Sequence, residues 1–84
     1  LCLSQSLDWA KRRIADGERD PEVLASGITQ QIQAHPLASI DYIKLVDAEN
    51  LSPIDRIEAP VLCALAVHLG NTRLIDNTVL TPSD

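Results

Sequence analysis

The first fifteen residues of the chain place apolar side chains at helical spacing. These side chains recur at steps of four, three and four residues, at Leu3, Leu7, Ala10 and Ile14. Such spacing puts all of them on one face of a helix. Gly17 follows, and glycine readily takes the left-handed conformation found just past the last turn of a helix. We therefore predict an amphipathic helix that ends shortly before Gly17.

A second helix is predicted to begin at residue 20. Asp20 suits the N-cap and Pro21 the first helical position, and the apolar stripe that follows consists of Leu24, Ile28 and Ile32. Pro36 ends this helix, because the residue before a proline is disfavoured in the helical conformation. Gly27 lies inside it, where glycine costs about 1 kcal/mol relative to alanine. Gly27 is either a tolerated surface glycine or a point of close approach to the first helix, and we prefer the second interpretation.

After Pro36 the pattern changes to that of β-strands. Residues 38–47, ASIDYIKLVD, are rich in β-formers, and residues 47–50 have the composition of a turn. In residues 61–70, VLCALAVHLG, medium and large apolar side chains at odd positions alternate with mostly small ones at even positions. This alternation predicts a strand covered on both faces, with its small face closely approached by another part of the protein.

The dipeptide Gly70-Asn71 has glycine first, the order that a two-residue type II′ hairpin turn requires. Residues across the hairpin then pair when their numbers sum to 141, the sum of 70 and 71. Asp76 therefore lies opposite Leu65, and its neighbour Asn77 projects to the other face of the sheet. The return strand is expected over residues 72–77. The predicted fold is α+β, with two N-terminal helices packed on a three-stranded antiparallel sheet (α-α-β-β-β), and all 84 residues form a single domain.

Composition narrows the classes of function. The formal charge of −5 argues against a nucleic-acid partner, whose phosphates need a basic footprint. The cationic run Lys11-Arg12-Arg13 is surrounded by acidic residues, and we interpret it as a solvated helix face. No stretch is long and apolar enough to cross a membrane, and no signal peptide is recognisable. The two cysteines form neither a disulfide framework nor a zinc motif, and Cys63 is expected to be a buried free thiol in a cytoplasmic protein.

The sequence assigns no catalytic, cofactor-binding or metal-binding residue. Its three glycines are isolated, so no phosphate loop is formed, and His35 and His68 have no carboxylate at metal-ligand spacing. The candidate structural or interdomain residues are Arg73, Asp76 and Asn77. A carboxylate on the face that bears the larger side chains must be hydrogen-bonded or salt-bridged. Asp76 either accepts bonds that fix the sheet or contacts a second domain, in which case Arg73 and Asn77 also do so from the opposite face.

Several segments together resemble a known family. A GERD turn at residues 17–20, the segment PLASIDY at residues 36–42 and the strand TRLIDN at residues 72–77 occur in this order. Each piece alone is weakly specific, but the ordered set resembles the C-terminal domain of pantoate–β-alanine ligases. The likeness runs over nearly the whole chain. Since the chain also starts in mid-pattern without methionine, we expect it to be a piece of a longer protein.

The resemblance implies an enzyme that joins pantoate to β-alanine with ATP and Mg²⁺, through a pantoyl-adenylate, releasing AMP and pyrophosphate. In this family a Rossmann-like N-terminal nucleotidyltransferase domain, with a His-x-Gly-His motif, carries the chemistry and the dimer contact. None of its motifs is present here, so the resemblance implies that this domain alone is inactive and binds no cofactor. Its implied role is to cover the nucleotide cleft as a lid and to exclude water from the acyl-adenylate.

Two alternatives stay open. Some family members are fused to a cytidylate kinase, so the terminal segment TVLTPSD is either a natural end or a linker to a further domain. From a different class, the chain is a free-standing, non-catalytic interaction module whose exposed edge strand pairs with a partner.

Overall fold

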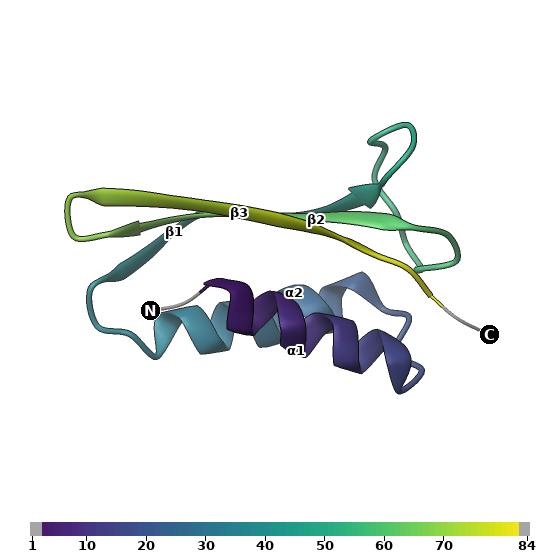
Figure 1. The fold of residues 1–84 in the computed structure, drawn as a ribbon, viewed down its shortest axis with the longest axis horizontal. Coiled ribbons are helices and arrows are strands. Elements are labelled where there is room, and N and C mark those ends of the chain that lie inside the picture. Colours follow the sequence, from purple (N-terminus) through teal and green to yellow (C-terminus); the bar gives the residue numbers. More distant parts are fainter. Residues whose placement is uncertain (1–2, 83–84) are drawn as a thin grey trace.

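The structure, a computed structural model, describes residues 3–82 and has two helices and three strands in the predicted order. These elements are α1 (Leu3–Ala15), α2 (Pro21–Gln33), β1 (Ala38–Asp47), β2 (Val61–Leu69) and β3 (Thr72–Leu80). Both helices lie on one face of the sheet, α2 against β1 and α1 against β3 (Figure 1). The predicted α+β fold is confirmed. The other face of the sheet carries no helix from the described residues, and we call it the open face.

The end of α1 has the conformation predicted from Gly17. Gly17 has a φ of 105°, its N–H donates to the carbonyl oxygen of Ile14 (3.0 Å), and the N–H of Glu18 donates to that of Arg13 (2.9 Å). This pair of bonds satisfies carbonyls that would otherwise be left without partners in the last turn. The amide of Asp20 donates to the Glu18 carboxylate, and this bond, first among several, lowers the pKa of Glu18.

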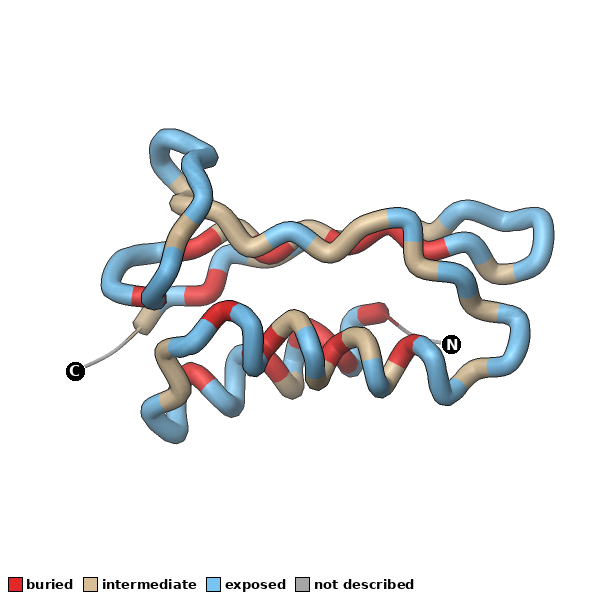
Figure 2. The backbone as a smooth tube through the Cα atoms, turned by 180° about the vertical axis from the view of Figure 1, so that it is seen from behind, coloured by how far each residue is buried: buried red, intermediate tan, exposed pale blue. Residues whose placement is uncertain are grey.

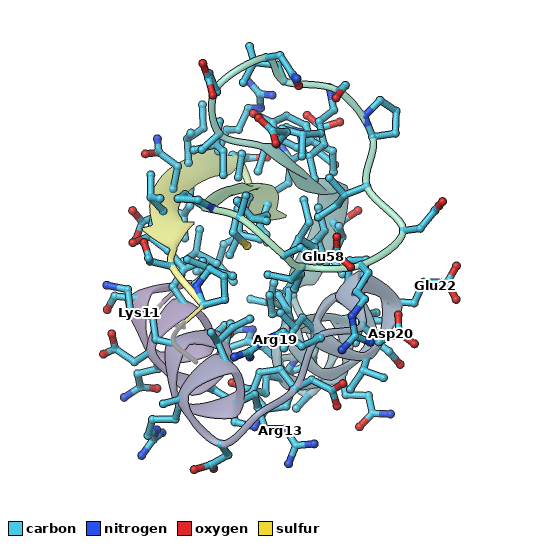
Figure 3. The ribbon with its side chains drawn as sticks, turned by 90° about the vertical axis from the view of Figure 1, so that its right-hand side faces the viewer. Lys11, Arg13, Arg19, Asp20, Glu22 and Glu58 are labelled. Carbon is cyan, nitrogen blue, oxygen red and sulfur yellow. The ribbon has the colours of Figure 1, made fainter. Side chains whose placement is uncertain are left out.

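The turn also ties the helices to the segment between β1 and β2. The Nη1 of Arg19 donates to the carbonyl oxygen of Ile14 (2.8 Å), and the backbone oxygen of Arg19 accepts from the N–H of Ile57 (2.8 Å), whose side chain is fully buried. Arg19 lies between the ends of the two helices in Figure 3. Asp20 caps α2 as predicted, because its carboxylate accepts from the N–H of Glu22 (2.9 Å).

Gly27 marks the closest approach of the two helices. A Cβ placed on Gly27 would lie 2.0 Å from Cη2 of Trp9 in α1, and 2.6 and 2.7 Å from two further ring carbons. Only a residue without a side chain leaves room for the indole ring at this position. The interpretation of Gly27 as a close-contact glycine is therefore confirmed.

The sheet is antiparallel with β2 in the centre, and the β2–β3 register is the predicted one, with Leu65 opposite Asp76. Gly70 has a φ of 61°, as the first position of a type II′ turn requires. The strand β3 is longer than the predicted residues 72–77 and ends at Leu80. Residues 78–80 are therefore strand, and the side chain of Leu80 packs into the core, where it is only 1% exposed.

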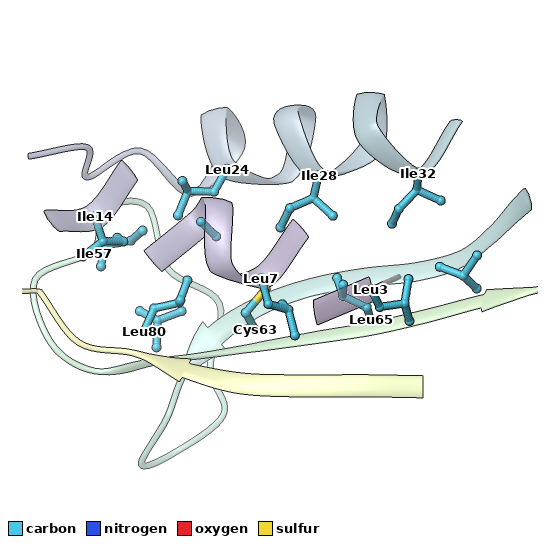
Figure 4. Packing of buried hydrophobic residues seen from close by; sticks show 13 residues of the cluster. Leu3, Leu7, Ile14, Leu24, Ile28, Ile32, Ile57, Cys63, Leu65 and Leu80 are labelled. Atoms are coloured by element: carbon cyan, nitrogen blue, oxygen red, sulfur yellow. The ribbon is translucent and has the colours of Figure 1, made fainter. Parts of the chain in front are cut away.

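The core lies between the helix layer and the sheet (Figures 2 and 4). Its fully buried side chains come from both helices, from the segment before β2 and from the odd positions of β2, and include Leu24, Ile28, Ile32, Ile57, Cys63 and Leu65. Cys63 is a free thiol, as predicted, and its burial raises its pKa to about 11. Aliphatic packing thus holds the domain together with almost no aromatic contribution.

The segment between β1 and β2 begins with the predicted turn. The Oδ1 atom of Asp47 accepts from the N–H groups of Glu49 (2.8 Å) and Asn50 (3.1 Å). Leu51 follows with a φ of 61°, a left-handed conformation that costs a non-glycine residue energy, and its side chain is 60% exposed. The segment rises from the sheet on the side away from the helices (Figures 1 and 2).

Candidate functional site

Asp76 lies on the helix-covered face of the sheet, as the hairpin register predicted. It is half-buried and stands opposite the fully buried Leu65. Its Oδ1 atom accepts a hydrogen bond of 2.8 Å from the N–H of Asn77. Because β3 is an edge strand, this bond occupies an amide that an added strand would otherwise seek. The contact agrees with the interpretation of Asp76 as a residue that fixes the strand, which stays a prediction.

Arg73 and Asn77 lie on the open face, opposite His68 and Ala64 of β2. The Nη2 atom of Arg73 donates to Oδ2 of Asp41 at 2.8 Å, so this ion pair reaches from β3 across β2 to β1. Both side chains remain close to half exposed, and such a pair contributes at most about 1 kcal/mol. The structure therefore brings Arg73 and Asn77 to one face and places Asp76 on the other.

Sequence reasoning did not identify Asp41 as the partner of Arg73. The register of β1 shifts between Ile40 and Tyr42, and the extra residue is Asp41. A bulge of this kind re-aims the side chain that it inserts. The sequence contains a signal of this bulge. Ile40 and Ile43 both face the core, although side chains three positions apart in a regular strand point to opposite faces.

The remaining part of the open face is mostly apolar. Ala66 is fully buried by its neighbours although no described helix covers it, and Tyr42 and Ile75 flank it on either side. Ile75 is 58% exposed and Val79 49%. The sequence predicted that another part of the protein approaches this small face closely, and within residues 3–82 no helix does so.

Two hollows of about 410 Å³ each lie elsewhere on the surface. One is formed by the segment before β2 and is lined by Asp47, Ile54, Asp55, Arg56, Glu58, Ala59 and Val61. The other lies over the Trp9–Gly27 contact and includes the carboxylates of Asp20 and Glu22. Each hollow has more carboxylates than cations, and Arg56 is paired with Glu58 at 3.6 Å. Neither arrangement favours a polyphosphate, which needs cations and backbone N–H groups.

The described part of the chain lacks two further kinds of feature. Between residues 3 and 82 no three His, Cys, Asp or Glu side chains are close enough together to hold a metal ion. None of the helices in that range has the length and apolar character needed to cross a membrane.

Comparison with known proteins shows the family to which the chain belongs. The family described as pantoate-beta-alanine ligase matches residues 1–79. The chain belongs to the pantoate–β-alanine ligase family. Its similarity to the pantothenate synthetase of Pelotomaculum thermopropionicum is 46% identity over 80 residues, which is 95% of this chain and 28% of that protein. The pantothenate synthetase of Clostridioides difficile is also 46% identical, over 77 residues, with 92% of this chain and 27% of that protein covered.

Solved structures agree with the sequence relatives. The crystal structure of pantothenate synthetase from Thermus thermophilus superimposes with a TM-score of 0.82 and 25% identity, covering 95% of this chain and 29% of that one. The chain thus spans less than a third of the length of the relatives it matches. The family resemblance drawn from the GERD, PLASIDY and TRLIDN segments is confirmed.

Proposed function

We propose that this chain is the C-terminal lid domain of an ATP-dependent pantoate–β-alanine ligase, placed over the nucleotide cleft of a Rossmann-like N-terminal domain. The observation that carries the proposal is that 95% of the chain matches only 28% of a pantothenate synthetase, as expected of one domain of a larger enzyme. The whole enzyme uses ATP and Mg²⁺, forms a homodimer through its N-terminal domain and acts in the cytoplasm.

The proposed reaction has two steps. The pantoate carboxylate attacks the α-phosphorus of ATP, so that pantoyl-adenylate forms and pyrophosphate leaves. The amine of β-alanine then attacks the acyl carbon, so that an amide bond forms and AMP leaves. Both steps occur in the N-terminal domain, and water competes with the amine for the acyl-adenylate. Closure of a domain over such an intermediate excludes this competing water.

The geometry of the described residues supports a covering role. The hollows at residues 47–61 and around Trp9 are rich in carboxylates, which repel phosphate groups. The sheet presents a broad face without helices, on which a second domain has room to pack (Figure 1). A domain whose hollows are acidic and whose sheet offers a largely apolar face is suited to close over a site carried elsewhere.

The experiment compares the full-length enzyme with a version that lacks residues 1–84. AMP and pantothenate are measured together in the presence of ATP, Mg²⁺, pantoate and β-alanine. The intact enzyme is expected to release one AMP for each pantothenate formed, because little acyl-adenylate is lost to water. The shortened enzyme is expected to form pantothenate more slowly and to release AMP in excess.

Two outcomes contradict different parts of the proposal. If the intact full-length protein forms no pantothenate, the proposed ligase activity is refuted. If the shortened enzyme keeps the rate of pantothenate formation and the one-to-one ratio of AMP to pantothenate, the lid role is refuted and the ligase activity stands. Sequencing beyond residue 84 addresses the fused variant, because a cytidylate kinase domain there would begin with a phosphate-binding loop.

A further inference from the structure

The two faces of the sheet differ in what covers them. The odd positions of β2 pack against the helices and are almost completely buried. On the open face, Ala64 and Ala66 form a low floor between the larger side chains of the edge strands. Ile75 and Val79 of β3 flank this floor with 58% and 49% exposure, and the exposed Asn77 lies between them. Exposed apolar side chains that gather on one face among polar residues are typical of a protein contact site.

The charged groups of the open face are arranged so that removing the face from water costs little desolvation free energy. Arg73 is paired with Asp41 at 2.8 Å, and the ammonium group of Lys44 lies 5.0 Å from the centre of the Tyr42 ring. A charge that already has an electrostatic partner loses less on leaving water than an isolated charge.

The segment between β1 and β2 adds a wall at one end of this floor. It rises on the open-face side (Figure 1) and is held by the Asp47 hydrogen bonds and by a bridge between Val46 and Pro53. Leu51 belongs to this wall and is exposed in a left-handed backbone conformation. Residues in such sparsely populated backbone conformations persist where the surrounding structure holds them, and they cluster at functional sites.

We propose that the open face, together with this wall, is the surface by which the domain docks on the remainder of its own polypeptide. This inference rests on the proposed function and names the docking surface of the lid. The chain covers 28% of the length of its relative, so more than two thirds of the polypeptide is tethered close by. A tethered surface is present at a high effective concentration and competes well against a second molecule.

The charged groups of this surface come from both the sheet and the wall. The open face carries Lys44 and Arg73 with Asp41, and the wall adds the exposed side chains of Glu49, Asp55, Arg56 and Glu58. The choice of the same polypeptide over a second copy therefore rests on the tether, and the isotope test below decides between them. The partner surface is apolar where it meets Ile75 and Val79 and acidic where it meets Lys44.

The test uses full-length enzyme, and labelling is read at the peptide that carries the introduced cysteine. Ile75→Cys probes the open face, and Val23→Cys, at an exposed apolar position of α2, is the matched control. Cys2 is replaced by serine in both, while Cys63 stays, because it is buried with a raised pKa. The rate of reaction with N-ethylmaleimide is measured with and without ATP and pantoate. Val79→Cys is the second probe of the same face if the first variant fails to fold.

Binding of ATP and pantoate is expected to slow the labelling rate at position 75 by at least about tenfold more than at position 23. A tenfold slowing corresponds to a docked state that is populated about 90% of the time. A benzophenone attached at position 75 is expected to cross-link to residues upstream of this domain. In an equal mixture of ¹⁴N and ¹⁵N enzyme, these products carry one isotope only, because the contact lies within one polypeptide.

Equal labelling rates at the two positions would overturn the docking surface, and so would cross-links of mixed isotope, which indicate a second copy. The same preparations are assayed for pantothenate formation. If the enzyme is active and position 75 reacts freely in the presence of ATP and pantoate, only the docking surface is refuted. If the wild-type enzyme has no ligase activity, the proposed function is refuted, whatever the cross-links show.

Discussion

Replacing Gly27 with alanine tests how closely the two helices pack. The substitution has two opposed effects, because alanine favours the helix by about 1 kcal/mol while the new methyl group collides with Trp9. Its Cβ would lie 2.0 to 2.7 Å from three ring carbons, whereas unstrained carbon contacts are about 3.5–4.0 Å. The half-buried ring must therefore move by more than about 1 Å, for which overpacking costs of about 2–3 kcal/mol apply. The net expectation is a loss of about 1–2 kcal/mol.

The assay is urea unfolding followed by far-ultraviolet circular dichroism, with thermal unfolding as a second measure. Each kcal/mol lost is expected to lower the Tm of a domain of this size by about 4–8 °C. The measurement is repeated in a Trp9→Ala background, where the ring is gone and only the helix-forming tendency of alanine remains. There Gly27→Ala is expected to stabilise the domain by up to about 1 kcal/mol, so the substitution changes sign.

The reasoning is refuted if Gly27→Ala has the same effect in both backgrounds within about 0.5 kcal/mol, the scatter expected of independent sites. Gln33→Ala, at an exposed position of α2, controls for general effects on the helix. It is expected to change stability little in either background, because glutamine and alanine are both good helix formers.

Three further predictions concern single side chains. Asp20→Ala removes the cap of α2 and is expected to cost about 1 kcal/mol, with most of the loss restored by Asp20→Ser; equal urea midpoints for both variants would contradict this. Asp76→Ala is expected to lower the Tm clearly more than Glu49→Ala, because only Asp76 is half-buried and holds an edge amide through its carboxylate; equal Tm values would contradict it. Burial favours the protonated Cys63 thiol by raising its pKa from an ordinary value of 9.0 to about 11. Its contribution to stability is therefore full below pH 9 and lost as the pH rises to 11. The free energy of unfolding of a Cys63→Ala variant should depend less on pH between 9 and 11 than that of the wild type.

The fold could be predicted in detail because its local signals agree with one another. The GERD turn combines a glycine that ends one helix with an aspartate that caps the next, and both act as predicted. The order of Gly70 and Asn71 was enough to set the register of β2 and β3. Local signals of this kind depend on neighbouring residues only, so they can be read without knowledge of the tertiary structure.

The parts that were missed depend on contacts between distant residues. The ion pair of Arg73 with Asp41 crosses the whole sheet and requires the bulge in β1, which the sequence marks only by the change of apolar phase between Ile40 and Ile43. The extension of β3 to Leu80 follows from the end of the core, which Val61 and Ile57 leave open for a large side chain. The tie between Arg19 and Ile57 was also missed, because it joins segments far apart in the chain.

The alternation in β2 nevertheless predicts from the sequence alone that another surface approaches this strand. A strand with one face in water needs apolar residues on the other face only, and its outward positions are normally polar. The outward positions of β2 are instead Leu62, Ala64 and Ala66, with His68 only at the end, next to the hairpin. The helices cover the opposite face, so this pattern favours the proposed packing of a second surface on the open face. The hypothesis of a partner thus follows from the pattern of one strand, whereas the family match shows only which proteins the domain is related to.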